Sequence, residues 1–355
     1  MRVVLAPDCF TGTASAAEAA TALAAGWRSV APADSLVLRP VSDGGPGLVD
    51  TLAASLPGSR TPVPGLLLAA GVGYVESAVG CGPQAMAAAG RDVRTGSTDA
   101  VGRLVAAAAA MAGVHTVVVG LGGSATNDGG AGLWAALGAE PADPLLGGGI
   151  GLSRVSEVSV PALPGVRLVA ATDVDNPLLG LYGASAVYGP QKGADDAAIM
   201  ALDIALERWA DVVEAATAMP GLRSAPGAGA AGGLGFGLLA LGAERTSGID
   251  LVLDAIGLAA EVAGADLLVT GEGRYDATSL RGKAVSGVAA IAQQAGVPCV
   301  VAAGQADIGA REAAAHGLDE VWTVAEQLGS ADAAIRAGAD GLTVLGAALA
   351  RTWSR

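Results

Sequence analysis

Short runs of branched apolar residues alternate along this chain with longer alanine-rich stretches, and this alternation restricts the folds that the chain can adopt. Seven runs have the length and the nearly continuous apolar character of strands that are buried on both faces. They are Arg2–Ala6, Ser35–Arg39, Thr116–Leu121, Arg167–Ala171, Asp266–Thr270, Pro298–Ala303 and Glu320–Val324. The alanine-rich stretches predict helices at Ser15–Val30, Ser97–Ala112, Asp195–Ala218, Lys283–Gln294 and Ser330–Arg351. We therefore expect an α/β protein with parallel sheets that helices cover on both faces.

The middle of the chain differs in composition from its two ends. With 355 residues the chain exceeds the usual size of a single core, so two domains are expected. The middle contains irregular glycine-rich stretches, of which Pro226–Gly237 is a candidate for a hinge or for a close approach of two backbones. We expect residues 1–61 and 264–355 to form a doubly wound parallel-sheet domain, with residues 62–263 inserted as a second α/β domain. Because such sheets bind ligands beyond the carboxyl ends of their strands, the active site is expected in the cleft between the domains.

Charge and scarce residue types exclude several classes of function. A net charge of −14 argues against a nucleic-acid partner, because phosphate contacts need an excess of Lys and Arg. The longest apolar stretch, residues 104–121, contains Gly, His and Thr, which favours a helix followed by a strand over a membrane span. The first five residues resemble a strand and lack a secretion-signal pattern. Three cysteines without metal-type spacing predict free thiols in a cytoplasmic protein, and two histidines are too few for a His/Cys zinc site.

Lysine and asparagine are rare in this chain. Each occurs twice, at Lys192 and Lys283 and at Asn127 and Asn176, and all four lie in segments rich in glycine and aspartate. Arginine supplies the other positive charges, and a compact ammonium is not interchangeable with a guanidinium. We infer that the two lysines are required where they stand, and we expect both to bind an anion.

The strongest motif is the loop Gly120–Gly132, which follows a Thr-Val-Val-Val strand. Its glycines allow backbone N–H groups to approach an anion closely, and its polar side chains add further donors. The residues expected to bind substrate or nucleotide here are Gly122, Gly123, Ser124, Thr126 and Asn127. The adjacent Asp128 could hold Mg²⁺ or accept a proton. The loop lacks the Gly-Lys-Ser/Thr ending of a Walker A loop, and its match to the dinucleotide pattern G-x-G-x-x-A is weak because the loop continues beyond Ala125.

Two carboxylates follow the first two predicted strands. Asp8 lies between the first strand and a helix that begins with the capping box of Ser15 and Glu18. Capping explains the helix start but not Asp8, which suits a ligand or metal site at the end of a strand. Asp43 lies in a glycine-rich turn after the second strand, where it is either an ordinary turn residue or a second carboxylate at the same edge of the sheet.

A fourth segment follows the strand that begins at Arg167. Asp173 and Asp175 share a face if the chain stays extended, so both could line one site, although a solvated turn would also contain them. The loop that follows contains Lys192 between a Gly-Pro-Gln run and a glycine. A lysine there can bind phosphate as a point charge, whereas the commoner alternative is a solvated loop lysine.

A fifth segment concentrates charge after the strand that ends near Thr270. The charged residues are Glu272, Arg274, Asp276, Arg281 and Lys283. The cations could neutralise a phosphate or carboxylate, with Glu272 or Asp276 as metal ligand or base. The alternative is a network of ion pairs at the surface.

These motifs resemble those of the bacterial glycerate kinase family, of the glycerate 2-kinase type. The similarity runs along nearly the whole chain in order. It includes Ala-Pro-Asp-x-Phe-x-Gly, Asp-Gly-Gly-x-Gly, Gly-x-Gly-Gly-Ser-Ala-Thr-Asn-Asp-Gly-Gly-Ala-Gly, Asp-Val-Asp-Asn-Pro-Leu, Gly-Pro-Gln-Lys-Gly-Ala, Gly-Ala-Gly-Ala-Ala-Gly-Gly-Leu-Gly and Thr-Gly-Glu-Gly-Arg. The resemblance implies a phosphotransferase that uses ATP and Mg²⁺ to phosphorylate D-glycerate, with 2-phosphoglycerate as product, and a fold of two α/β domains around a cleft.

The chain departs from the family pattern near its N-terminus. Thr11 stands where the family usually has a lysine, and Pro46 stands where it usually has a glutamate. The stretch between Gly47 and Glu76 is also shorter than in the family, as if a hairpin were missing. The loss of two charges leaves three hypotheses: a glycerate kinase, a kinase of another small hydroxy acid or polyol, and a non-catalytic protein that binds a metabolite.

Under the kinase hypotheses the residues take the following expected roles. Phosphoryl transfer needs cations, backbone donors and one base. We assign Lys192, Lys283 and the Gly120–Gly132 loop to anion binding, with Asp43, Arg274 and Arg281 as further binding residues. The candidates for the base or for Mg²⁺ ligation are Asp8, Asp128, Asp175 and Glu272, of which the last three are the expected metal ligands.

Overall fold

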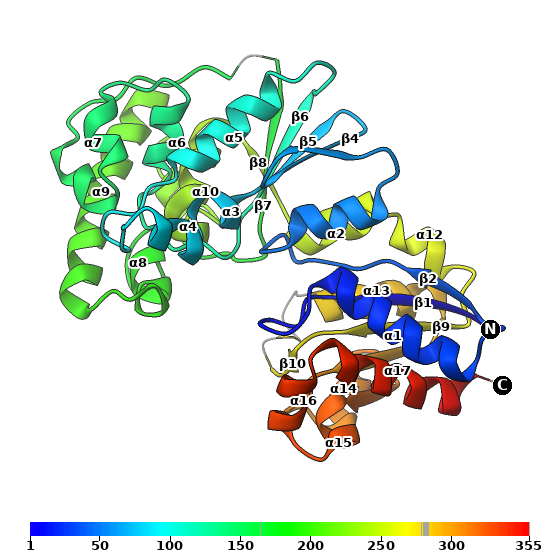
Figure 1. Cartoon of the computed structure of the whole chain (residues 1–355). Helices are drawn as coiled ribbons and strands as arrows, with labels where there is room; N and C mark the ends of the chain where they lie inside the picture. The colour runs from blue at the N-terminus through cyan, green and yellow to red at the C-terminus, as the bar shows by residue number, and fades with distance from the viewer. Residues whose placement is uncertain (164, 278, 280–283, 355) are drawn as a thin grey trace. The chain divides into compact units, whose positions relative to one another are not determined.

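The computed structural model describes residues 1–163, 165–277, 279 and 284–354, and the chain forms two compact units (Figure 1). Unit 1 comprises Met1–Asp43, Asp50–Pro57 and Ile249–Arg355. Unit 2 comprises Gly44–Val49 and Gly58–Gly248. The domain boundaries predicted from the sequence, at 61/62 and 263/264, lie a few residues after the boundaries of the compact units at 57/58 and 248/249. The assignment of residues 44–49 to unit 2 was not predicted.

Unit 1 contains a parallel five-stranded sheet in the order β13-β11-β9-β1-β2. Its strands are β1 (Arg2–Pro7), β2 (Ser35–Leu38), β9 (Leu267–Gly271), β11 (Cys299–Ala303) and β13 (Glu320–Thr323), and a second small sheet pairs β10 (Arg274–Tyr275) with β12 (Gln305–Ala306). Val3 and Val269 lie in a cluster with residues of the flanking helices, while Val4 and Leu268, which point to the opposite face, are also fully buried. The predicted doubly wound α/β architecture is therefore confirmed for this unit.

Helices cover both faces of the unit 1 sheet. They are α1 (Ala16–Val30), α2 (Leu48–Ser55), α11 (Gly248–Ala255), α12 (Leu258–Val262), α13 (Ala284–Ala295), α14 (Ala310–Ala315), α15 (Val324–Leu328), α16 (Ala331–Ala337) and α17 (Ala339–Trp353). The predicted capping box of Ser15 and Glu18 begins α1. Glycines let α1 and α17 touch, since a Cβ on Gly26 would lie 1.9 Å from the Thr343 carbonyl oxygen and one on Gly346 would lie 2.2 Å from the Leu23 carbonyl oxygen.

Unit 2 contains a mixed six-stranded sheet in the order β3-β4-β5-β6-β7-β8. The strands are β3 (Arg60–Val63), β4 (Leu66–Ala69), β5 (Val72–Glu76), β6 (Thr116–Gly120), β7 (Arg167–Ala171) and β8 (Glu244–Thr246). The first three strands run antiparallel to one another, and β5 to β8 are parallel. The stretch between Gly47 and Glu76 contains the β3–β4 hairpin.

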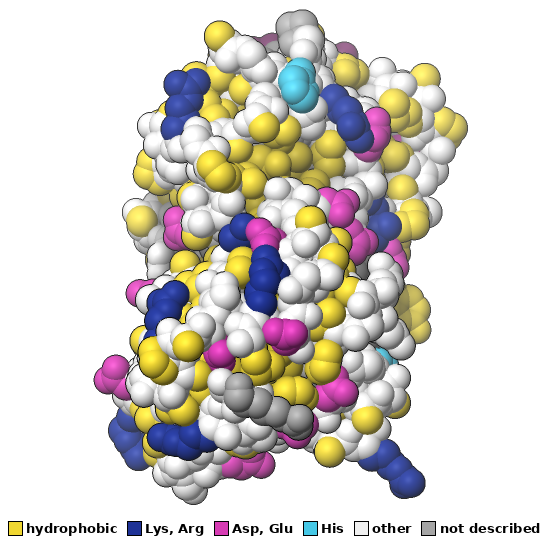
Figure 2. Space-filling view, turned by 90° about the vertical axis from the view of Figure 1, so that its right-hand side faces the viewer, with side chains coloured by type: hydrophobic (Ala, Val, Ile, Leu, Met, Phe, Trp, Pro, Cys, Tyr) yellow, Lys and Arg dark blue, Asp and Glu magenta, His cyan; other side chains and the backbone are white. Residues whose placement is uncertain are grey.

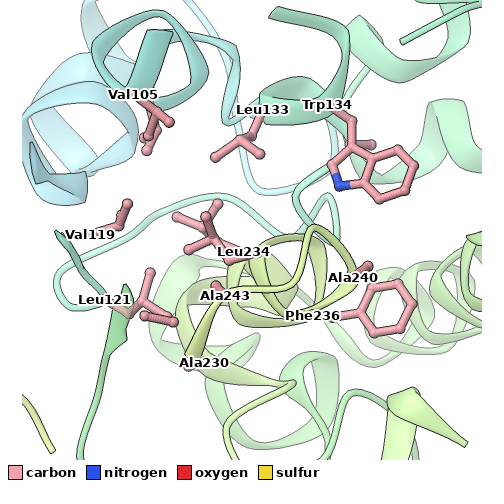
Figure 3. Packing of buried hydrophobic residues seen from close by; sticks show 14 of the residues in the cluster. Val105, Val119, Leu121, Leu133, Trp134, Ala230, Leu234, Phe236, Ala240 and Ala243 are labelled. Atoms are coloured by element: carbon pink, nitrogen blue, oxygen red, sulfur yellow. The ribbon is translucent and has the colours of Figure 1, made fainter. Parts of the chain in front are cut away.

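The helices of unit 2 enclose a core of small and branched side chains around two tryptophans. These helices are α3 (Ser77–Cys81), α4 (Pro83–Ala88), α5 (Asp99–Ala109), α6 (Ala131–Ala136), α7 (Ala142–Leu146), α8 (Ala184–Tyr188), α9 (Asp196–Thr217) and α10 (Ala230–Ala240), with single 3₁₀ turns η1 (Gly149–Arg154), η2 (Pro190–Lys192) and η3 (Leu222–Ser224). Figure 3 shows Val119 and Leu121 from the β6 region, Trp134 from α6 and Phe236 from α10 among the buried residues. Trp134 also packs edge-on against Trp209, with ring centroids 5.5 Å apart.

No single helix in the described ranges is long and apolar enough to cross a membrane. Helices α16 and α17 reach the required length and apolarity only when they are taken together, and they are bent by 109° at their junction.

Candidate active site

Close backbone packing explains most glycines of the Gly120–Gly132 loop. Gly123, Gly129 and Gly130 have φ values of 65°, 62° and 77°, which L-residues rarely adopt. A Cβ on Gly122 would lie 2.5 Å from the Cα of Gly45. Backbone conformation and close packing therefore explain why these positions are glycine. The glycines alone do not indicate anion binding, so the evidence for a binding site has to come from the polar groups of the loop.

Lys192 is the cation that the structure brings to this loop. Its Nζ donates hydrogen bonds to the Ser124 hydroxyl at 3.0 Å and to the Thr126 carbonyl oxygen at 2.8 Å. Burial lowers the pKa of Lys192 to about 8, while Cys81 and Asp128 act in the opposite direction. The loop of η2 thus holds a partly buried ammonium against the glycine-rich loop, and this contact between the two motifs was not predicted.

An unpaired polar atom lies in the same loop. Asn127 donates through Nδ2 to the Ser185 hydroxyl at 2.8 Å, but its Oδ1 is buried without a hydrogen-bond partner. The Thr126 hydroxyl is buried as well, next to the buried Cys81 thiol. Buried polar atoms without partners are costly, and they concentrate where a ligand or water completes the site. Ser185, from α8, was missed because a serine in an alanine-rich helix gives no distinct signal.

Asp128 has a structural environment that does not favour its predicted role as a base or metal ligand. One carboxylate oxygen accepts hydrogen bonds from the backbone N–H and hydroxyl of Thr98, at 2.8 and 2.9 Å, and from the N–H of Gly132 at 3.1 Å. The other accepts from the N–H of Gly130 at 3.2 Å. The side chain is fully buried, and burial raises its pKa. Four donors from the protein already hold this carboxylate, which favours a structural role for Asp128.

Pro46, one of the departures from the family pattern, packs on the same loop. A Cβ on Gly123 would lie 2.5 Å from the Pro46 ring.

The N–H groups of Gly47 and Val49 donate to the buried carboxylate of Glu76, at 2.9 and 3.1 Å, so this side chain caps the start of α2. Glu76 was missed because its strand, β5, was not predicted; an acid at the end of the apolar run Val72–Glu76 was the available signal.

The residues after β7 separate into buried and exposed groups. Asp173 accepts hydrogen bonds from the Ser247 hydroxyl at 2.7 Å and the Gly248 N–H at 3.0 Å. The side chain of Asp175, by contrast, is 77% exposed and forms an ion pair with Arg245. A solvated turn, the alternative given above, describes Asp175 better than a catalytic or metal-binding role. Asn176 accepts a hydrogen bond from the Tyr188 hydroxyl at 2.7 Å.

In unit 1 three carboxylates lie near the carboxyl ends of β1 and β9. Asp8 is largely buried, and burial together with the negative charges of Asp43 and Glu272 raises its pKa to about 7. The N–H of Cys9 donates to Asp8 Oδ1 at 2.6 Å. The exposed Thr11 lies in the same loop, which touches the β9 loop at Gly273. The negative charges of Asp43 and Glu272, both predicted as site residues, therefore contribute to the raised pKa of Asp8.

The predicted cationic cluster of unit 1 is described only in part. Arg274 is 59% exposed and pairs with Asp307, and its Nε also lies 3.8 Å from Asp276, as expected for a surface ion-pair network. Arg281 and Lys283 lie outside the described residues. Figure 2 shows the same trend on one face of the molecule, where Lys and Arg side chains are dispersed and several adjoin Asp or Glu.

The expected metal ligands do not form a preformed cage. Within the part of the chain that the structure describes, no group of three or more His, Cys, Asp or Glu side chains is arranged to hold a metal ion. Asp128 is held by four protein donors and Asp175 is exposed, so Glu272 remains as the third of the expected ligands.

Comparison with known proteins assigns the chain to a family. A model of the glycerate kinase family matches residues 3–354. The chain is 36% identical to glycerate 2-kinase of Escherichia coli K12, over 96% of this chain and 95% of that protein, and 38% identical to glycerate kinase of Bacillus subtilis 168, over 91% and 90%. Its fold matches a crystal structure assigned to glycerate kinase 2 of Salmonella typhimurium LT2, with a TM-score of 0.81, 35% identity and coverage of 99% of this chain and 98% of that one. The chain therefore belongs to the glycerate kinase family.

Proposed function

We propose that this protein transfers a phosphoryl group from ATP to D-glycerate and forms 2-phosphoglycerate. The family match and the relatives named glycerate kinase and glycerate 2-kinase support this activity. Within the molecule, the observation that carries the proposal is the partly buried ammonium of Lys192, which the Ser124 hydroxyl and the Thr126 carbonyl of the Gly120–Gly132 loop hold in place. A cation that is partly removed from water is costly to the fold, and an anionic ligand offsets that cost.

Each unit supplies one part of the proposed chemistry. Lys192 binds a phosphate or carboxylate group, and its charge stabilises negative charge that develops during transfer. Asp8 accepts the proton of the attacking hydroxyl, for which a pKa of about 7 is suitable near neutral pH. Lys283 remains a proposed second cation for anion binding.

The described residues fit ATP and Mg²⁺ in different ways. When bound, ATP supplies the phosphoryl group, and the Lys192 site has the positive charge and donors that a polyphosphate requires. Mg²⁺ is commonly held by one or two carboxylates together with substrate phosphates, so it does not need a cage of three protein ligands. Glu272 is the proposed protein ligand.

A second candidate is a kinase of another small hydroxy acid or polyol. The observation that favours it is the uncharged residue at two positions where the family resemblance implies a charge: Thr11 in the Asp8 loop of unit 1, and Pro46, whose ring packs on Gly123 in unit 2. Both candidates take a small-molecule substrate.

A coupled assay of ADP release across small hydroxy acids and polyols tests both candidates. Turnover with D-glycerate supports the first, and turnover only with other compounds supports the second. Thermal stabilisation by these compounds without any turnover would overturn both and favour a metabolite-binding protein.

A further inference from the structure

A buried hydrogen-bond network links Thr98 to the loop that holds Lys192. Thr98 is fully buried at the N-cap of α5 and donates twice to one oxygen of Asp128, through its N–H at 2.8 Å and its hydroxyl at 2.9 Å. The same hydroxyl accepts a hydrogen bond from the N–H of Leu133 at 3.0 Å. One threonine side chain therefore joins α5, Asp128 and the first turn of α6.

Asp128 in turn limits where the Lys192 acceptors can lie. The carbonyl oxygen of Thr126, two residues earlier, accepts a hydrogen bond from Lys192 Nζ at 2.8 Å. Helix α10 packs against the other side of this segment. A Cβ on Gly232 would lie 2.0 Å from the Thr126 carbonyl oxygen, and the Gly129 N–H donates a hydrogen bond to the Gly232 carbonyl at 3.0 Å. The Thr126 carbonyl is thus confined between α10 and the Asp128 anchor.

The segment between the anchor and Lys192 is only partly held by its own side chains. Asn127 is bound to Ser185 through Nδ2, while its Oδ1 has no hydrogen-bond partner. The Asp128 carboxylate anchors the end of this segment, and Thr98 supplies two of the four hydrogen bonds that hold that carboxylate.

We propose that Thr98 is a positioning residue for Lys192: through Asp128 it fixes the segment whose Ser124 hydroxyl and Thr126 carbonyl hold the ammonium. The proposal rests on the proposed anion-binding role of Lys192. It assigns Asp128 an indirect part in turnover in place of a metal-binding or proton-accepting one.

The test compares three threonine variants by steady-state kinetics and by NMR of the lysines. Thr98→Val keeps the shape of the side chain and removes the hydroxyl, Thr98→Ser keeps the hydroxyl, and Thr323→Val is the matched control. Thr323 is also a buried threonine at a helix N-cap, where its hydroxyl accepts from the Glu326 N–H at 3.1 Å, but it lies in unit 1. Because the chain has only two lysines, lysine-selective labelling gives two side-chain signals, and Lys192→Arg assigns them.

Thr98→Val is expected to lower kcat by about tenfold or more and to move the Lys192 signal, since small misplacements of a charged group are costly in catalysis. Thr98→Ser should stay within about threefold of the wild type, and Thr323→Val should lose thermal stability without changing kcat or the Lys192 signal. A folded Thr98→Val protein with wild-type kcat or an unmoved Lys192 signal would overturn the proposal.

Two further outcomes keep the test decisive. If Thr98→Val does not fold, Thr98→Ala decides by the same two measurements: a lowered kcat with a moved Lys192 signal supports the proposal, and a wild-type kcat or an unmoved signal contradicts it. Lys192→Met separates this inference from the proposed function. If Lys192→Met retains turnover, the anion-binding role fails together with the proposal, whereas an inactive Lys192→Met beside a fully active Thr98→Val removes the Thr98 proposal alone.

Discussion

The two units place opposite charges at the ends of their strands. In unit 2 the loop after β6 receives a partly buried ammonium, and burial lowers the pKa of Lys192. In unit 1 carboxylates gather after β1 and β9, and burial together with mutual repulsion raises the pKa of Asp8. Both pKa shifts mean that the charged form of the side chain is less stable in the folded protein than in water. A fold keeps such costs mainly where function requires them, so the comparison indicates an anion-binding part in unit 2 and a proton-accepting part in unit 1.

The largest effect is expected at the cation of unit 2. Lys192→Met should lower kcat/KM by about 10³-fold, because the methionine keeps the length of the side chain and removes the charge. Lys192→Arg should restore little of it, since a guanidinium does not match the two acceptors that hold the ammonium. Near-wild-type steady-state rates in Lys192→Met would contradict the proposed anion-binding role of Lys192 in unit 2.

In unit 1, Asp8→Asn should lower kcat by about 10²-fold while it stabilises the fold. The folded protein retains a proton on Asp8 up to about pH 7, whereas the unfolded chain loses it near 3.8, so Asp8 destabilises the wild type as pH rises from about 4 to 7. Without added metal at pH 8, the variant should be more stable by up to about 2 kcal/mol in urea unfolding. Asp254→Asn, an exposed position on α11, is the control, and an equal gain there would contradict this explanation.

The pH dependence sharpens the comparison further. Lys192 binds an anion only when it is protonated, so kcat/KM should fall about tenfold per pH unit above about pH 8. Lys192 should also stabilise the fold increasingly between pH 8 and 10.5, because there the unfolded chain is protonated and the folded protein is not. A kcat/KM that stays constant up to pH 10 would show that the charge of Lys192 is not required.

A smaller effect is expected where Pro46 packs on the loop. Gly123→Ala should lower the free energy of unfolding by about 1–3 kcal/mol, because it forces a residue with a φ of 65° against the Pro46 ring. Gly138→Ala is a control that separates the two causes, since Gly138 also has a positive φ but has nothing within 4 Å of an added Cβ. Equal losses in the two variants would show that the contact with Pro46 adds nothing.

The smallest effect is expected at Asp175. Its ion pair with Arg245 is largely exposed, so Asp175→Asn should change stability by less than about 1 kcal/mol and kcat by less than about twofold. A large loss of kcat would restore the catalytic role that the sequence suggested for this residue.

The sequence predicted the buried strands well and the packing of the glycines poorly. All seven predicted strands are present, because parallel strands buried on both faces are continuously apolar. The three antiparallel strands before Glu76 were missed, since they are short and interrupted by turns. For the glycine-rich stretch Pro226–Gly237, the predicted close approach of two backbones is confirmed, since a Cβ on Gly232 would lie 2.0 Å from the Thr126 carbonyl oxygen.

The candidate site was predicted in its residue types but not in their partners. Lys192 and Ser124 were chosen from separate motifs, and they are in contact. Composition could not reveal that the Asp128 carboxylate accepts four hydrogen bonds, because three of the donors are backbone N–H groups and the fourth is the hydroxyl of the distant Thr98. Hydrogen-bond saturation depends on chain segments that meet only in the folded protein.

The most direct test of the proposed glycerate kinase activity is to follow the reaction of D-glycerate, ATP and Mg²⁺ by ³¹P NMR with the wild-type protein and with Lys192→Met. We predict that the wild type produces the signal of 2-phosphoglycerate at the rate at which ADP appears, and that Lys192→Met produces almost none. Absence of a phosphoglycerate signal with the wild type, or equal rates for both proteins, would contradict the central claim.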